Sequence, residues 1–299
     1  MNSFEVFLAA RFRDFPILFA ATRMCSALWR PSRIVVAVPL RDRAVVQTGL
    51  GPSIEVIDEN TLLTSLDRES YERRPIPMFP RSFGWYLQQF LKIEYCRQSA
   101  AKYCLVWDAD TVPLQALNFF DGTGRIYLTK AEEFHDPYFH TFRELFGVSA
   151  PSSKSFISQH MFVRCSAMRA MCGLIEERHK VDHWTDALGT ILENHPGRTN
   201  LFSEYETYAN YMLLHHPDQV VTRELDWSRS RCAQAWSTPT KQLAVARAHR
   251  LAFVAYEHKR TLCARALVKA LENGPSVCRG IAVRVLRSYA KSARPAFLN

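Results

Sequence analysis

Short apolar runs alternate with longer helical patterns through the first half of the chain, and this order restricts the fold more than any other feature. We expect strands at residues 4–9, 33–38, 54–57 and 103–107, with helices at 14–29 and about 83–97. Two parallel strands need a crossover connection of a dozen or more residues, which is commonly a helix. The sequence therefore predicts an α/β fold with a mostly parallel central sheet and helices on both faces.

The second half has weaker patterns and contains no internal repeat or Gly/Ser linker. Strand-like runs occupy 125–129, 156–164 and 251–256, and helical patterns occupy 137–146, 165–180 and 204–215. No composition change marks a boundary before the last forty or so residues. We predict one domain over residues 1–258 and a basic, helical C-terminal extension over residues 259–299.

The positive charge of the chain is concentrated at its C-terminal end. The net charge is +9, and residues 259–299 hold nine Lys and Arg residues but one acid, Glu272. A nucleic-acid-binding protein carries its basic surface on the folded domain, so we expect no nucleic-acid partner. Arg284, Arg287, Lys291 and Arg294 fall on one stripe of a helix. This stripe predicts either contact with an anionic membrane surface or a solvated helix whose apolar face packs on the domain.

Cysteine spacing and hydropathy narrow the remaining classes of protein. None of the eight cysteines forms a CxxC pair, so a structural zinc site is not expected. The apolar runs near 15–21 and 251–256 are shorter than the roughly 18 residues that a membrane-spanning helix requires. The first residues lack the basic segment of a secretory leader. We therefore expect a cytoplasmic protein with reduced thiols, associated at most peripherally with the inner face of the membrane.

Two aspartates directly follow the most apolar predicted strand, in the run Trp107-Asp108-Ala109-Asp110. If the extended geometry continues, residues two apart point to the same side, and both carboxylates face one ligand. Carboxylate oxygens are the ligands that Mg²⁺ and Mn²⁺ prefer, and these ions bind diphosphates. The alternative is a turn whose acids are simply solvated. In α/β sheets, ligands bind at the carboxyl ends of strands, which favours a metal–diphosphate site.

This acidic pair and its flanking motifs resemble those of GT-A fold nucleotide-sugar glycosyltransferases. The pair corresponds to their DxD motif, and the likeness extends to a bacterial group of uncharacterised glycosyltransferase-like proteins. The shared segments, which together span about residues 4–258, are Gly84-Trp85, Gln88-Gln89, Leu91-Lys92, Trp107-Asp108-Ala109-Asp110, Ser158-Gln159-His160-Met161 and Ser203-Glu204-Tyr205-Glu206.

The resemblance implies a Rossmann-like sheet and a metal-dependent transfer of sugar from a nucleoside-diphosphate sugar of the UDP or GDP type. A glycan or lipid-linked acceptor would receive the sugar, as in polysaccharide biosynthesis. By this likeness Asp110 binds Mn²⁺ or Mg²⁺ directly, and Asp108 contacts the donor ribose or a metal-bound water. A late histidine completes the metal site in many such enzymes, and His258 has the matching position, with His215 and His216 as alternatives.

The segment Ser203–Glu206 has two interpretations. Ser203 as N-cap and Glu206 three residues later form the pattern of a capping box, which is the structural interpretation of Glu206. Glu204 has no such role, and the resemblance makes it the candidate base that accepts the proton of the acceptor hydroxyl. A helix N-terminus keeps such a carboxylate ionised but makes it a weaker base.

Further candidate residues are assigned from position alone. Arg11 and Asp14 follow the first strand, where the resemblance implies the nucleotide base or ribose. Lys92 is either a phosphate ligand of the donor or a solvated lysine on a helix face. Gln159 and His160 are placed on the acceptor side, with a hydrogen-bonded, half-buried core histidine as the alternative for His160. We assign Trp85 and Tyr86 to the core or a pocket wall rather than to a sugar-stacking surface.

Two other functions fit parts of the sequence. The run Leu105–Val112 also resembles the first strand of haloacid-dehalogenase-like phosphatases, in which Asp108 would be the nucleophile and Asp110 the general acid. About 100 residues precede this strand, however, and no Asp-Asp or Gly-Asp pair follows it to complete such a site. The basic extension also fits a non-enzymatic adaptor that docks on a membrane surface.

Overall fold

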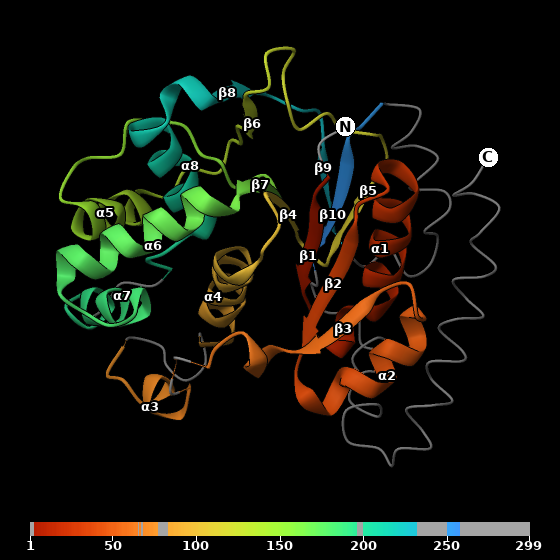
Figure 1. Ribbon diagram of the computed structural model, residues 1–299, viewed down its shortest axis with the longest axis horizontal. Coiled ribbons are helices and arrows are strands. Elements are labelled where there is room, and N and C mark those ends of the chain that lie inside the picture. Colours follow the sequence, from red (N-terminus) through yellow and green to blue (C-terminus); the bar gives the residue numbers. More distant parts are fainter. Residues whose placement is uncertain are drawn as a thin grey trace. The chain divides into compact units, whose positions relative to one another are not determined.

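The computed structural model describes residues 3–64, 66, 68–76, 83–195, 200–231 and 250–257 (Figure 1). The chain divides into two compact units, each assembled from separated segments. Unit 1 contains the described parts of Met1–Ala9, Glu59–Trp107 and Asn118–Glu224. Unit 2 contains the described parts of Ala10–Asp58, Asp108–Leu117 and Leu225–Asn299. The predicted division at residue 258 stays a prediction, because His258 and the basic extension lie outside the described residues.

Unit 1 is built on strands β1 (Glu5–Ala9), β4 (Tyr103–Trp107) and β7 (His160–Arg164). β1 and β4 are parallel, with Val6 opposite Leu105, whereas β7 runs antiparallel to β4. Every residue of β4 is buried, as expected for a strand in the middle of a covered sheet. A second parallel pair joins β6 (Ile126–Thr129) to β8 (Val220–Arg223).

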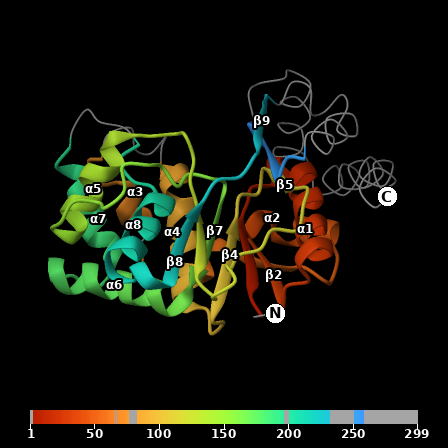
Figure 2. The same ribbon diagram turned by 90° about the horizontal axis from the view of Figure 1, so that it is seen from above.

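Helices cover the strands of unit 1. α4 (Phe83–Gln98) contacts β1 and packs on α6 (Cys165–His179), which follows β7 directly. Figure 1 and Figure 2 both show α5, α6, α7 and α8 as one group of helices. The remaining helical elements of this unit are α3 (Arg68–Glu72), α5 (Asp136–Phe146), α7 (Trp184–Glu193), α8 (Glu204–His215), η2 (Glu59–Thr61) and η3 (Pro217–Gln219).

Unit 2 contains a βαβ segment and a small three-stranded sheet. β2 (Arg33–Val38) and β3 (Glu55–Asp58) are parallel and joined through α2 (Leu40–Leu50). η1 (Phe12–Asp14) leads into α1 (Phe15–Trp29), which packs against β5 (Thr111–Pro113). β10 (Phe253–Glu257) pairs antiparallel with β5 and parallel with β9 (Ser228–Arg231).

These pairings confirm the predicted α/β fold with a mostly parallel central sheet. Most of the strong predicted elements are present within a residue or two of their expected limits. The strand expected over 156–164 begins only at His160, because Gln159 adopts a left-handed backbone conformation with φ of 64°. The helix α2 and the short strands β5, β8 and β9 have no counterpart in the sequence prediction.

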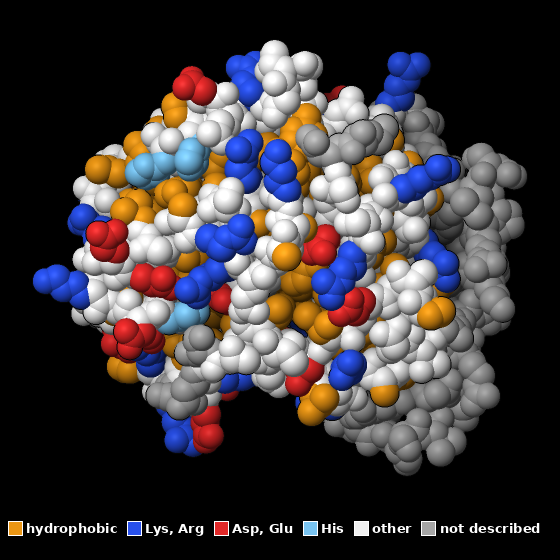
Figure 3. All heavy atoms as spheres, viewed as in Figure 1, with side chains coloured by type: hydrophobic (Ala, Val, Ile, Leu, Met, Phe, Trp, Pro, Cys, Tyr) orange, Lys and Arg blue, Asp and Glu red, His pale blue; other side chains and the backbone are white. Residues whose placement is uncertain are grey.

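On the face that Figure 3 shows, basic and acidic side chains are interspersed. Within the described ranges, none of the helices combines the length and the hydropathy that a membrane crossing would need.

Candidate functional site

The acidic pair of unit 2 lies in a turn. β4 ends at Trp107, and the amide of Thr111 donates a hydrogen bond to the carbonyl oxygen of Asp108 over 3.0 Å. The chain therefore reverses across Asp108 and Asp110 instead of continuing as a strand, which corrects the geometry that we expected for the pair. Both aspartates are half-buried.

Strand β10, the last described element of the chain, holds this turn in place. The amide of Tyr256 in β10 donates to the carbonyl oxygen of Asp110 over 2.8 Å. Next to it, Thr111 pairs with Ala255 across the β5–β10 ladder, and the Thr111 hydroxyl lies 3.3 Å from Asp110 Oδ1. The backbone of the acidic turn is thus fixed by strand pairing on its C-terminal side.

Asp108 and Asp110 carry carboxylate oxygens, which are the kind of ligand that a divalent cation takes. Mg²⁺ is commonly held by one or two carboxylates, with water and phosphate oxygens as its other ligands. Asp108 and Asp110 supply two such carboxylates. Within the described ranges, no three His, Cys, Asp or Glu side chains gather into a metal-binding group. His258, the predicted third ligand, lies outside those ranges.

In the same unit, Arg11 directly precedes η1 and Asp14 is its last residue. The Asp14 carboxylate accepts a hydrogen bond from the Arg11 amide over 2.9 Å, so it caps the turn that leads into α1. Arg13 Nε is 3.7 Å from Asp14 Oδ1. This local role leaves their predicted contacts with the nucleotide as a prediction.

In unit 1, Lys92 of α4 and Glu204 of α8 form a buried ion pair. Lys92 Nζ lies 2.6 Å from Glu204 Oε1 and donates a second hydrogen bond to the Tyr205 hydroxyl over 3.2 Å. Each of the two charged side chains is only 4% exposed. The interpretation of Lys92 as a solvated lysine is therefore wrong.

The start of α8 confirms half of the capping box. The Ser203 hydroxyl accepts a hydrogen bond from the Glu206 amide over 3.3 Å, as an N-cap should. Glu206 Oε1 accepts hydrogen bonds from Ser155 Oγ over 2.6 Å and from the Phe156 amide over 3.0 Å. Glu206 Oε2 is buried and has no hydrogen-bond partner among the described residues. The carboxylate thus binds a distant segment instead of closing the box.

Burial perturbs the acid–base behaviour of Glu206. Desolvation raises its pKa to about 7, against the lowering effect of the hydrogen bonds from Ser155 and Phe156. The nearby carboxylates of Glu133 and Glu204 raise the pKa further. Glu206 therefore changes protonation state near neutral pH.

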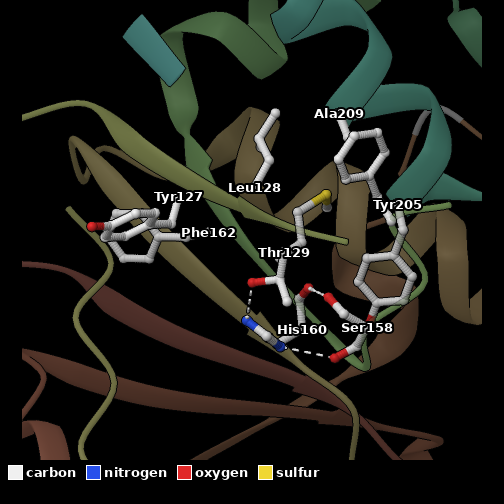
Figure 4. Close-up of a pocket in the computed structure, with 10 residues that line it drawn as sticks. Tyr127, Leu128, Thr129, Ser158, His160, Phe162, Tyr205 and Ala209 are labelled. Atoms are coloured by element: carbon white, nitrogen blue, oxygen red, sulfur yellow. Dashed lines mark hydrogen bonds between the residues drawn. The ribbon is translucent and has the colours of Figure 1, made fainter. Parts of the chain in front are cut away.

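His160 lines a small pocket beneath α8 (Figure 4). Its Nε2 lies 3.2 Å from Thr129 Oγ1, and its Nδ1 lies 2.8 Å from the Ser158 carbonyl oxygen. Desolvation and the Arg223 guanidinium lower the pKa of His160 to about 3, so the ring is neutral at pH 7. The pocket offers about 10 Å³, which holds about one water molecule and no sugar ring. His160 is fully buried, not half-buried, while Gln159 beside it is partly exposed.

Several residues that lie around Glu206 and His160 could not be identified from the sequence. Ser155 and Thr129 reach Glu206 and His160 only because segments far apart in the chain meet in space. Arg223, whose Nε donates to Thr129 Oγ1 over 3.1 Å, lies on the unpredicted strand β8. His215, an alternative for the metal, lies beside Tyr211 with ring centroids 4.6 Å apart and an interplanar angle of 36°.

Three solved structures are similar to this chain at low sequence identity. Among solved structures, the apo form of mouse xyloside xylosyltransferase 1 is 13% identical, with a TM-score of 0.49, over 85% of this chain and 97% of that chain. An active-site mutant of LgtC is 13% identical, with a TM-score of 0.48, over 92% of this chain and 99% of that chain. The galactosyltransferase LgtC with donor and acceptor sugar analogues is 13% identical, with a TM-score of 0.44, over 96% of this chain and 95% of that chain.

At the level of sequence, the comparison with curated proteins finds no match. One family model matches residues 9–238, which is more than half of the chain and includes β4, the acidic turn and α8. The chain therefore belongs to DUF6492, a family of unknown function.

Proposed function

We propose that this protein is a metal-dependent glycosyltransferase that moves a sugar from a nucleoside-diphosphate sugar to a glycan or lipid-linked acceptor. The observation that carries the proposal is the pair Asp108 and Asp110, placed in a braced turn directly after a fully buried strand of an α/β sheet. Ligand sites form at such strand ends. The ordered motifs described from the sequence add support.

In this proposal the two carboxylates hold Mn²⁺ or Mg²⁺ against the diphosphate of the donor. When bound, the cation would stabilise the negative charge that develops on the departing diphosphate. The pairing with Tyr256 and Ala255 keeps the turn in one backbone conformation, so little ordering is needed when the donor binds. Arg11 and Asp14 remain our candidates for contacts with the ribose or base.

The buried ion pair changes the roles that we propose for Glu204 and Lys92. A carboxylate that is 2.6 Å from a buried ammonium group is stabilised in its ionised form, which weakens it as a base. We propose that the pair positions α8 against α4 and contributes to catalysis only through that positioning. Gln159, which is partly exposed beside the buried His160, is retained as the acceptor-side candidate.

Calorimetric titration with UDP and with GDP, each with and without Mn²⁺, tests the donor site. We expect one nucleotide to bind only with the metal, and Asp110→Asn to lose that binding while it remains folded. Asp218→Asn is the matched control, because Asp218 is exposed on η3. Binding that does not need the metal, or that survives in Asp110→Asn, would contradict the proposal. If neither nucleotide binds, the donor-site assignment fails and phosphatase activity is assayed next.

The membrane contact of residues 259–299 is a separate proposal, as is the cytoplasmic location. The basic stripe of this extension supports it, because each Lys or Arg near an anionic surface adds about 1 kcal/mol of attraction. Co-sedimentation with phosphatidylserine vesicles, with and without residues 259–299, measures the contact. Equal sedimentation of the two proteins would contradict it.

A further inference from the structure

Two buried thiols of unit 1 lie in contact, and the proposed function uses neither of them. Cys104 lies in β4, and Cys165 is the first residue of α6. Sγ of Cys165 donates a hydrogen bond to Sγ of Cys104 over 3.3 Å. Both residues are fully buried, and they are 61 residues apart in the chain. The fold therefore brings together two oxidisable groups from distant segments.

Strand pairing fixes this contact. β4 and β7 run antiparallel, with Cys104 opposite Val163, and α6 continues directly from β7 (Figure 1). The ladder reaches Cys165, because its amide donates to the carbonyl oxygen of Lys102 over 3.1 Å. Residues two apart on a strand point to the same face, so Cys165 is the diagonal neighbour of Cys104 on one face of the sheet. The backbone thus holds the two sulfur atoms beside each other.

We propose that Cys104 and Cys165 form a reversible disulfide when the protein meets a peroxide, and that this bond locks β4 to the start of α6. The S–S bond of a disulfide is about 2.05 Å long, so the sulfur atoms must approach each other by about 1.3 Å. Because both side chains already lie on one face, the approach needs side-chain rotation and no change in strand pairing. The inference goes beyond the proposed function and does not depend on it.

Hydrogen peroxide is the oxidant in this reaction. The thiolate of one cysteine attacks a peroxide oxygen, so that an S–O bond forms, the O–O bond breaks, and the departing hydroxide takes up a proton to become water. The sulfur of the second cysteine then attacks the sulfenic acid, so that the S–S bond forms and the S–O bond breaks. The second thiol proton leaves with that oxygen as water. Two thiols thus lose two electrons and two protons, and one peroxide becomes two waters.

The surroundings of the pair make this reaction slow at neutral pH. The hydrogen bond with Cys104 and burial raise the pKa of the Cys165 thiol, which leaves little of the reactive thiolate. The rate should therefore increase in alkaline solution. In a reducing compartment both groups stay thiols, which agrees with our expectation from the sequence.

Peptide mapping of the full-length protein tests the proposal. The protein is treated with hydrogen peroxide at pH 7 and at pH 9, and the remaining thiols are blocked with N-ethylmaleimide in acidic denaturant. Trypsin then separates the two cysteines into the peptides 103–125 and 165–169, each of which contains one cysteine. We expect mass spectrometry to find these two peptides linked, more rapidly at pH 9, and to find them separate after treatment with dithiothreitol.

Thermal denaturation tests the lock. A cross-link between residues this far apart restricts the unfolded chain, so the treated protein should melt about 5 °C above the untreated one. Cys104→Ala receives the same treatment and should show no such rise, which separates the cross-link from other oxidation. Cys165→Ala serves if Cys104→Ala does not fold. Cys25→Ala, which removes a buried thiol of unit 2, is the matched control and should behave like the wild type.

Three results would overturn the proposal. The first is the absence of the linked pair of peptides after treatment of the folded wild type. The second is a link from Cys104 to Cys96, a buried thiol of α4 that trypsin leaves in the separate peptide 93–97. The third is a linked protein that melts no higher than the untreated one, which would show that the bond locks nothing.

Discussion

Lys92 and Glu204 are 112 residues apart in the chain, yet they form a buried ion pair in which Nζ lies 2.6 Å from Oε1. The Lys92 ammonium also lies 4.6 Å from the centre of the Tyr205 ring. Desolvating two charges is costly, and their attraction compensates only while both partners are present. The packing of α4 against α8 therefore depends on both charges being present.

Removing one partner of this pair should be much worse than removing both charges. Lys92→Met leaves a buried carboxylate unpaired, and we expect a loss of about 3–5 kcal/mol in the free energy of unfolding. Urea denaturation measures this loss. The double variant Lys92→Met with Glu204→Gln should recover most of it, because no charge then remains buried. Equal stability of the single and double variants would show that the ion pair is not what holds the two helices.

Acid should weaken the fold through His160. Its pKa is lowered to about 3 in the folded protein, against an ordinary value near 6.5, so the unfolded chain binds the proton more readily. The stability that the neutral ring contributes is complete above pH 6.5 and is lost as the pH falls towards 3. By pH 5 we expect a loss of about 2 kcal/mol relative to His160→Asn, which does not titrate. Parallel denaturant curves of the two proteins at pH 7.5 and pH 5 give the difference.

Glu206 should produce the opposite pH dependence. Its folded-state pKa of about 7 exceeds the ordinary value of 4.5, so the folded protein holds the proton more tightly than the unfolded chain. The resulting stability is complete below pH 4.5 and is lost as the pH rises through 7. Between pH 5 and pH 8 we expect the wild type to lose about 2 kcal/mol relative to Glu206→Gln. A constant difference between the two proteins over this range would place the Glu206 carboxylate in an ordinary, solvated state.

Gly49 of α2 should not tolerate a side chain. A Cβ atom added there would lie 2.2 Å from Cζ of Phe15, so the ring would have to move. We expect Gly49→Ala to cost about 1–3 kcal/mol of unfolding free energy, and Phe15→Leu to relieve part of the clash in the double variant. Gly173 of α6 has nothing within 4 Å of such a Cβ. Gly173→Ala is thus the matched control and should raise stability by about 0.5–1 kcal/mol, measured by thermal denaturation.

The elements that could be predicted are those whose residues carry a local pattern. The strand Tyr103–Trp107 is apolar throughout because it is covered on both faces, and Ser203 is recognisable as an N-cap because its partner is three residues away. α2 has a weak apolar stripe, and only the parallel pairing of β2 with β3 demands a helix between them. The break at Gln159 rests on one backbone angle, which an alternating pattern does not contain.

The candidate site could be predicted only in part, for the same reason. The sequence locates Asp108 and Asp110 after a strand, but it does not show the hydrogen bond from Tyr256, a residue distant in the chain, that holds the turn at Asp110. The roles of Lys92 and Glu206 change once their partners Glu204 and Ser155 are known. Long-range contacts decide the charge state of a buried group, and a single sequence does not show them.

The bond between the Tyr256 amide and the Asp110 carbonyl has a consequence for biosynthesis. During translation the acidic turn leaves the ribosome long before β10, which pairs with both β5 and β9. Until β10 emerges, β5 presents an open strand edge, which is a site for mispairing with other chains. The turn can therefore reach its final geometry only after residues 253–257 have been synthesised, so a nascent chain halted before residue 253 would carry the aspartates without the strand that holds their turn.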